Sequence, residues 1–163
     1  MLSIRQATLK DAGLLLTLIR ELADYEHGLE HVSNTEAGLA RDGFGPHRKF
    51  RAIIAEWDEH PAGYALFFDS YSTWRGPGIF LEDLFVRNEF RAKGIGKALL
   101  AYVADVAVKE NCYGVRWEVL DWNQLAIDFY KTIGAEFKTE WRLVVLTKDP
   151  LRRLSSEVTK IEL

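Results

Sequence analysis

The sequence has a single cysteine, Cys112, so no disulfide can form within the chain and no cysteine-based metal cluster can be built. It lacks a signal-peptide layout at its N-terminus, and no apolar run approaches the length of a membrane span. It also lacks a strong excess of either charge, because its net charge is −3. These absences predict a cytoplasmic protein with no attraction to nucleic acid or membranes.

What remains is the composition of a folded globular protein, with 48% apolar and 28% charged residues. A length of 163 residues suits one domain with a sizeable core. We therefore expect a single domain over residues 1–163.

Hydrophobic periodicity predicts the order of the secondary-structure elements. Strands are expected at residues 2–8, 50–57, 61–71, 78–86, 114–120 and 141–148, and helices at 11–26, 34–43, 96–112 and 123–135. Thr8 and Asp11 form a capping signal, Gly134 suits a helix C-terminus, residues 72–78 read as a loop, and residues 149–163 as a tail. Antiparallel strands followed by a strand–helix–strand crossover indicate an α/β (α+β) fold, with a mixed sheet covered by helices on both faces.

A glycine-rich turn, RAKGIG (91–96), connects the predicted strand 78–86 to the next helix. It is not a P-loop, because Ala98 stands where Ser or Thr is required, and it is not a Rossmann fingerprint, because Leu99 replaces the third glycine. One interpretation is a pyrophosphate cradle at a helix N-terminus, which phosphates approach closely because Gly94 and Gly96 lack side chains. The alternative is a tight turn with solvated cations.

Two adjacent carboxylates, Glu82 and Asp83, interrupt the apolar strand IFLEDLFV. Strand side chains alternate, so these two are expected on opposite faces of the sheet. A buried carboxylate is costly unless it is paired or in use, and an alkyl ammonium with a pKa near ~10.4 needs a proton acceptor before it can act as a nucleophile. We assign Glu82 to anchoring an amine and accepting its proton through water, and Asp83 to a structural role. The alternative is that arginines pair with both.

Two separated motifs resemble the Gcn5-related N-acetyltransferase (GNAT) superfamily. RAKGIG fits its R/Q-x-x-G-x-G/A pattern, and DWNQLAIDFYKTIGAEF resembles its second hallmark, an Asn before a helix that carries FY and ends in GA. IRELADYE, DGFG, FLEDLFV and VLDWNQLAIDFYK are similar to the diamine (spermidine/spermine) acetyltransferases. Ser72 and Thr73 before Trp74 match the branch called diamine acetyltransferase 2 or thialysine N-epsilon-acetyltransferase, whereas the polyamine branch has an acidic residue and proline there.

The resemblance implies a mostly antiparallel sheet, a homodimer and acetyl-CoA as cosubstrate. Backbone groups of Leu84, Phe85 and Val86 would pair with pantetheine, Asn123 would bind its arm or simply cap the helix, and Tyr130 would protonate the leaving thiolate. The remaining implied cofactor contacts are Arg91, Ala92, Lys93, Gly94, Ile95, Gly96, Lys97, Gln124, Leu125 and Ala126.

The substrate residues implied by the resemblance and by charge are Tyr25, Glu26, Glu82, Arg116, Trp117, Glu118 and Glu140. The acids would bind a second cationic group, and Arg116 would meet a carboxylate. For each of these charges a solvated surface position is an equally open interpretation.

We therefore expect direct transfer of an acetyl group from acetyl-CoA to a primary amine of a small cation, either a lysine analogue or a diamine. The alternatives are polyamine N1-acetylation, acetylation of proteins or peptides, and a non-catalytic acyl-CoA-binding protein. No metal site is expected, because Gly28 separates His27 from His31 and no third ligand is evident. Cys112 is expected to be an apolar-like residue and not a nucleophile.

Overall fold

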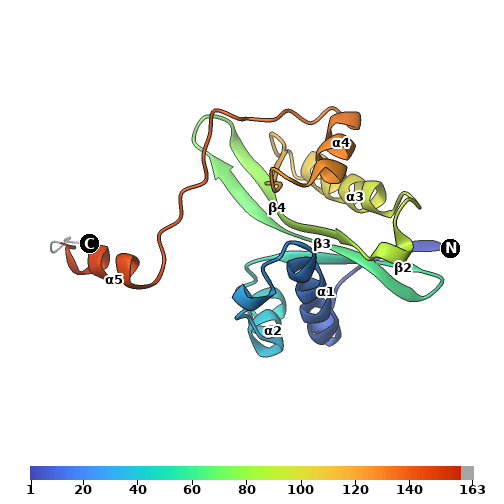
Figure 1. Cartoon of the computed structure of the whole chain (residues 1–163), viewed down its shortest axis with the longest axis horizontal. Helices are drawn as coiled ribbons and strands as arrows, with labels where there is room; N and C mark the ends of the chain where they lie inside the picture. The colour runs from blue at the N-terminus through green and yellow to red at the C-terminus, as the bar shows by residue number, and fades with distance from the viewer. Residues whose placement is uncertain (159–163) are drawn as a thin grey trace. The chain divides into compact units, whose positions relative to one another are not determined.

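The computed structural model describes residues 1–158 (Figure 1). These residues belong to two compact units, Met1–Leu120 and Asp121–Leu163. The first holds a five-stranded sheet with helices α1, α2 and α3, and the second holds α4 and α5. In residues 1–158, no helix is both long and apolar enough to cross a bilayer.

The sheet of the first unit confirms the predicted mixed topology. Its strand order is β1-β2-β3-β4-β5, antiparallel except for the parallel pair β4–β5. The strands are β1 (Leu2–Gln6), β2 (Arg51–Trp57), β3 (His60–Ser72), β4 (Gly76–Val86) and β5 (Val115–Arg116). Two expectations need correction. The loop 72–78 is mostly hairpin, because β3 and β4 remain paired as far as Ser72 and Gly76, and β5 has two residues instead of seven.

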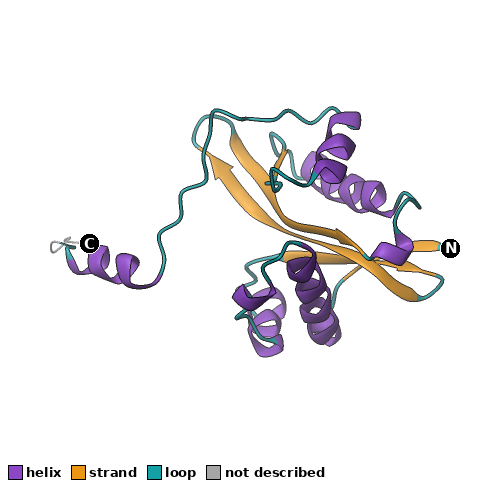
Figure 2. Ribbon diagram, in the orientation of Figure 1, coloured by secondary structure: helices purple, strands orange, loops and turns teal. Residues whose placement is uncertain are grey.

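Helices cover both faces of this sheet (Figure 2). Helices α1 (Ala12–Tyr25) and α2 (Glu36–Phe44) lie on one face, and α3 (Ile95–Lys109) lies on the other (Figure 1). Short 3₁₀ turns occupy Leu9–Asp11, Leu29–His31 and Asn88–Phe90. Helix α2 runs one residue past Gly43, where we expected it to stop, because Gly45 provides the C-cap.

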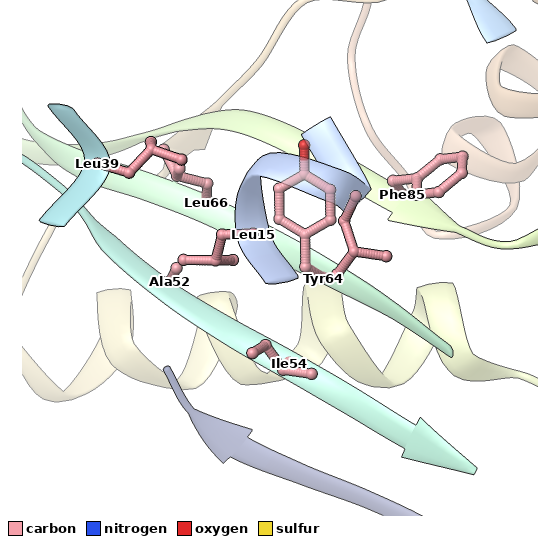
Figure 3. Packing of buried hydrophobic residues seen from close by; sticks show 8 residues of the cluster. Leu15, Leu39, Ala52, Ile54, Tyr64, Leu66 and Phe85 are labelled. Atoms are coloured by element: carbon pink, nitrogen blue, oxygen red, sulfur yellow. The ribbon is translucent and has the colours of Figure 1, made fainter. Parts of the chain in front are cut away.

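An apolar cluster joins α1 and α2 to the sheet (Figure 3). Leu15 and Leu18 of α1 are fully buried in it, as is Tyr64 of β3. Its other members are Leu39, Ala52, Ile54, Leu66 and Phe85. The cluster therefore packs α1 against β2, β3 and β4, and Tyr25 and Glu26 follow at the end of this helix.

The predicted capping signal is present, and it caps the 3₁₀ turn Leu9–Asp11 that leads into α1. The Thr8 backbone N–H and hydroxyl both donate to Asp11, at 2.7 and 2.8 Å. Arg5 adds two hydrogen bonds to the same carboxylate, at 2.9 and 2.8 Å, and they lower the pKa of Asp11 to about 2. Asp11 thus stabilises the fold above its unfolded pKa near ~3.9, and this contribution is lost as the pH falls through about 2.

In the second unit, α4 (Gln124–Thr132) confirms the predicted helix. The Asn123 side chain caps it by accepting a hydrogen bond from the Ala126 N–H at 3.3 Å. Gly134 has a positive φ of 79°, and the N–H groups of Gly134 and Ala135 donate to the carbonyls of Lys131 and Tyr130, both at 3.1 Å. This is a Schellman motif, so the predicted C-terminus is also confirmed.

The C-terminal predictions are wrong. Residues 141–147 form no strand, because an apolar segment becomes a strand only beside another strand, and the described residues provide none for it. Helix α5 (Lys148–Ser156) replaces most of the expected tail. Its Pro150 lies in the first turn, where proline is tolerated. Residues 159–163 of that tail lie outside the described residues.

Candidate functional site

The glycine-rich turn follows β4 and opens α3, as predicted. Gly94 caps the helix with φ +77°, and Ala92 before it has φ +60°. The first intrahelical hydrogen bond runs from the Ala98 N–H to the Gly94 carbonyl at 3.0 Å. Helix geometry therefore leaves the N–H groups of residues 95–97 available at a positively polarised helix end.

The space in front of this turn is open. A Cβ added at Gly94 would meet nothing within 4 Å, and one added at Gly96 would lie 3.7 Å from a Val86 methyl group. The fold itself thus has room for a side chain at Gly96. A pyrophosphate that approaches the backbone would explain why none is there.

The cations of the turn rest on aromatic rings of neighbouring elements. The Arg91 guanidinium lies 4.6 Å from the ring centre of Tyr25, and its Nε donates to the Val86 carbonyl at 3.1 Å. The Lys93 ammonium lies 4.9 Å from the ring centre of Trp57 and 5.2 Å from that of Phe90. Such contacts hold the charges near the helix N-terminus, where they complement an anion.

The second half of β4 has a free edge within the sheet, as far as the described residues show. Pairing with β5 is confined to Ile79 and Phe80, whereas β3 accompanies β4 on the other side as far as Val86. Among residues 1–158, the backbone of residues 81–86 therefore has a strand neighbour on one side only. An extended amide chain can add to such an edge by strand-like hydrogen bonds.

A bulge in β4 places the two adjacent carboxylates. Leu66 pairs with Asp83, but the next residue, Phe67, pairs with Leu81, so Glu82 is an extra residue. The expectation of strict alternation between Glu82 and Asp83 therefore does not apply, because a bulge interrupts it. Glu82 is exposed, and Asp83 is partly buried. The bulge is not apparent in the sequence, since it is defined by register with β3.

Asp83 is a partly buried carboxylate that has no cationic partner among residues 1–158. Within residues 1–158 its one side-chain hydrogen bond comes from the Tyr64 hydroxyl, at 2.9 Å. Burial raises the pKa of Asp83 to about 6, and the charges of Glu82 and Glu26 act in the same direction. Partial burial likewise raises the pKa of Glu26, which follows the end of α1. Near neutral pH these groups form a desolvated negative site, suited to a cation.

The other candidate substrate residues lie at several separate places along the chain. Tyr25 ends α1 beneath Arg91, Arg116 is exposed in β5, and Trp117 and Glu118 follow it. Glu140 is an exposed residue of the second unit. Only Glu26 and Glu82, among the predicted substrate residues, are near enough to Asp83 for their charges to shift its pKa.

The second unit carries the remaining candidate cofactor residues. Asn123, Gln124, Leu125 and Ala126 form the start of α4, where Asn123 fulfils the capping role that we considered as an alternative. Tyr130 is buried, with its ring centre 5.4 Å from that of Phe129. No group of three or more His, Cys, Asp or Glu side chains within residues 1–158 is arranged to hold a metal ion.

The sequence profile of the acetyltransferase (GNAT) family matches residues 16–135. A thialysine N-epsilon-acetyltransferase of Bos taurus is 39% identical over 165 residues, which cover 94% of this chain and 97% of that protein. A spermidine/spermine N(1)-acetyltransferase-like protein 1 of Homo sapiens is 32% identical over 94% of this chain and 24% of its own length.

An integron cassette protein from the mobile metagenome of V. cholerae has a similar solved structure, with a TM-score of 0.79 and 25% sequence identity. The match covers 96% of this chain and 98% of that one. The matches to the relative of Bos taurus and to this solved structure thus extend over nearly the whole chain, and the family match includes the glycine-rich turn.

Proposed function

The chain belongs to the GNAT acetyltransferase family and is an amine N-acetyltransferase, and we propose that its acceptor is the side-chain amine of a lysine-like amino acid such as thialysine. The observation that supports this proposal is the partly buried carboxylate of Asp83, which has no cationic partner among residues 1–158 and lies near the charges of Glu26 and Glu82. A small ammonium group would supply the missing charge.

In this proposal acetyl-CoA is bound by the turn and by the free edge of β4. The N–H groups of Ile95, Gly96 and Lys97 face the pyrophosphate, with Arg91 and Lys93 adding positive charge. The backbone of Leu84–Val86 pairs with the pantetheine amides, and Ala92 and Gly94 shape the turn. When bound, acetyl-CoA supplies the reactive thioester. The residues that we propose to hold it from the second unit are Asn123, Gln124, Leu125 and Ala126.

Substitution of Gly96 by alanine tests the cradle directly. The fold has room for the methyl group, and alanine is favoured over glycine in a helix by about 0.5–1 kcal/mol, so the thermal midpoint of the free protein should stay equal or rise. The same methyl group would stand between the helix N-terminus and the pyrophosphate. We expect affinity for CoA, measured by calorimetry, to fall by about tenfold or more.

Gly114→Ala is the matched control, because the fold has room for a methyl group there too: an added Cβ meets nothing within 4 Å. It should leave CoA affinity unchanged. Unaltered affinity in Gly96→Ala would remove the turn from cofactor binding.

The acceptor amine, in the same proposal, lies against Asp83 and Glu26. Glu82 stands exposed on the bulge beside them and can pass the proton of the ammonium group to solvent through water. Tyr25, Trp117, Glu118 and Glu140 would border the rest of the acceptor, and Arg116 would meet its carboxylate. Tyr130 is proposed as the acid that protonates the departing thiolate, since a phenol with pKa near ~10 can donate to it.

The test is thiol release from acetyl-CoA with a panel of amines: thialysine, lysine, putrescine, spermidine, spermine and a lysine-containing peptide. We expect thialysine or lysine to give the highest kcat/KM, since Ser72 and Thr73 precede Trp74 instead of an acidic residue and proline. A clear preference for spermidine or spermine would contradict this acceptor, and activity on the peptide alone would move the enzyme to protein modification.

One catalytic domain over residues 1–163 and a homodimer complete the proposal. The family match, 16–135, continues across the boundary between the two compact units.

The segment 141–146 is apolar and exposed, with Val144 at 88% and Leu143 at 71%, and an apolar stretch of this kind suits an interface between copies. Light scattering should give twice the mass of one chain, and a monomer at micromolar concentration would contradict the dimer.

A further inference from the structure

Tyr64 is the polar member of an otherwise apolar cluster. Its side chain is fully buried among leucines, Ile54 and Phe85, and its ring meets that of Phe85 edge-on at 6.4 Å. Figure 3 shows the hydroxyl oxygen pointing away from Ile54. A phenylalanine would fill the same volume without the cost of burying a hydroxyl group, so the oxygen itself calls for an explanation.

That hydroxyl donates to Oδ2 of Asp83 at 2.9 Å. The register explains the contact, because Tyr64 pairs with Phe85 and Leu66 pairs with Asp83. Tyr64 and Asp83 are therefore diagonal neighbours on one face, just beyond the bulge at Glu82. The bond occupies one carboxylate oxygen and leaves the other, Oδ1, with no side-chain donor among residues 1–158.

We propose that Tyr64 is a positioning residue for acceptor binding: its buried hydroxyl fixes the Asp83 carboxylate through Oδ2, so that Oδ1 receives the ammonium group. This inference rests on the proposed function, since it assumes that an amine binds at Asp83. A carboxylate held by one donor loses less conformational freedom when the amine binds, and this favours affinity.

The same hydrogen bond affects the charge of the site. Burial and the charges of Glu82 on β4 and Glu26 at the end of α1 raise the pKa of Asp83, and the bond from Tyr64 on β3 lowers it. Without the hydroxyl, the pKa of Asp83 should rise further, so the carboxylate would be protonated at pH values where the wild-type group is charged.

Tyr64→Phe removes the one oxygen and keeps the ring. We expect the acidic limb of the kcat/KM profile for the amine to move to higher pH by about half a unit to one unit. At pH 8 the KM for the amine should rise severalfold, while kcat and the KM for acetyl-CoA stay near the wild-type values. Tyr71→Phe, at an exposed position of β3, is the matched control and should leave the profile unmoved.

A double-mutant cycle with Asp83→Asn completes the test. If the hydroxyl acts through Asp83, adding Tyr64→Phe to Asp83→Asn should cause little further change in KM. If the wild type is active and Tyr64→Phe has the same pH profile and the same KM for the amine, the positioning role alone is overturned, and Tyr64 is a core residue. A wild type inactive on all amines would instead overturn the proposed function.

Discussion

Tyr130→Phe is expected to lower kcat for acetyl transfer by about 10²–10³-fold, because the leaving thiolate would lose its proton donor. The ring remains, so its contact with Phe129 in α4 and the Schellman turn after it should be kept. We therefore expect the KM values for acetyl-CoA and the amine to change by less than about threefold. Steady-state kinetics with the best amine of the panel give both quantities.

The matched control is Tyr71→Phe, which removes a hydroxyl from an exposed tyrosine at the outer end of β3. It should retain wild-type kcat. If Tyr130→Phe keeps full turnover as well, the acid must be another group or water, and Tyr130 would be a core aromatic of α4.

Asp83→Asn should produce the second large effect, a loss of about 30-fold or more in kcat/KM for the amine. Asparagine keeps the shape and can still accept the hydrogen bond from Tyr64, but it carries no charge for the ammonium group. Loss of one partner from a desolvated charge pair costs about 2–5 kcal/mol, and most of the loss should appear in the KM for the amine. The KM for acetyl-CoA should not change.

The same substitution should make the free protein more stable at neutral pH. The folded-state pKa of Asp83, about 6, lies above the unfolded value near ~3.9, so the wild-type free energy of unfolding falls as the pH rises from about 4 to about 6. Asp83→Asn removes that fall, so its free energy of unfolding at pH 7.5, measured by urea unfolding, should exceed that of the wild type by on the order of 1–3 kcal/mol.

A structural carboxylate would behave in the opposite way, because its removal would destabilise the fold. Loss of both stability and activity in Asp83→Asn would therefore contradict the binding role. Asp105→Asn, at an exposed ion pair with Lys109 on α3, is the matched control and should affect neither activity nor stability by much.

Local sequence signals predicted those parts of the site that depend on neighbours in the chain. Gly94 and Gly96 indicated the turn, Thr8 and Asp11 the start of the first helix, and Gly134 the end of α4. Each of these signals depends on a capping or turn geometry completed within a few residues.

The roles of Glu82 and Asp83 could not be distinguished in the same way. Their difference arises from the bulge against β3 and from the packing of α1, which are contacts between residues far apart in the chain. From the sequence we assigned Glu82 as the working carboxylate and Asp83 to a structural role, whereas in the structure Glu82 is exposed and Asp83 is the less exposed of the two.

The predictions for the C-terminal region were wrong for two different reasons. The segment 141–148 has the apolar and β-branched residues of a strand, but a strand needs a neighbour, and none of residues 1–158 pairs with it. Helix α5 did have a local signal, with Thr147 at its N-cap and Asp149 and Pro150 in its first turn, but we assigned these residues to a tail.

The most direct test of the account is mass spectrometry of the products formed from acetyl-CoA and thialysine. We predict one acetyl group on the side-chain amine of thialysine, with one free CoA released for each product molecule. Tight CoA binding without any acetylated amine, from thialysine or from the rest of the panel, would contradict the account and leave a protein that binds the cofactor without using it.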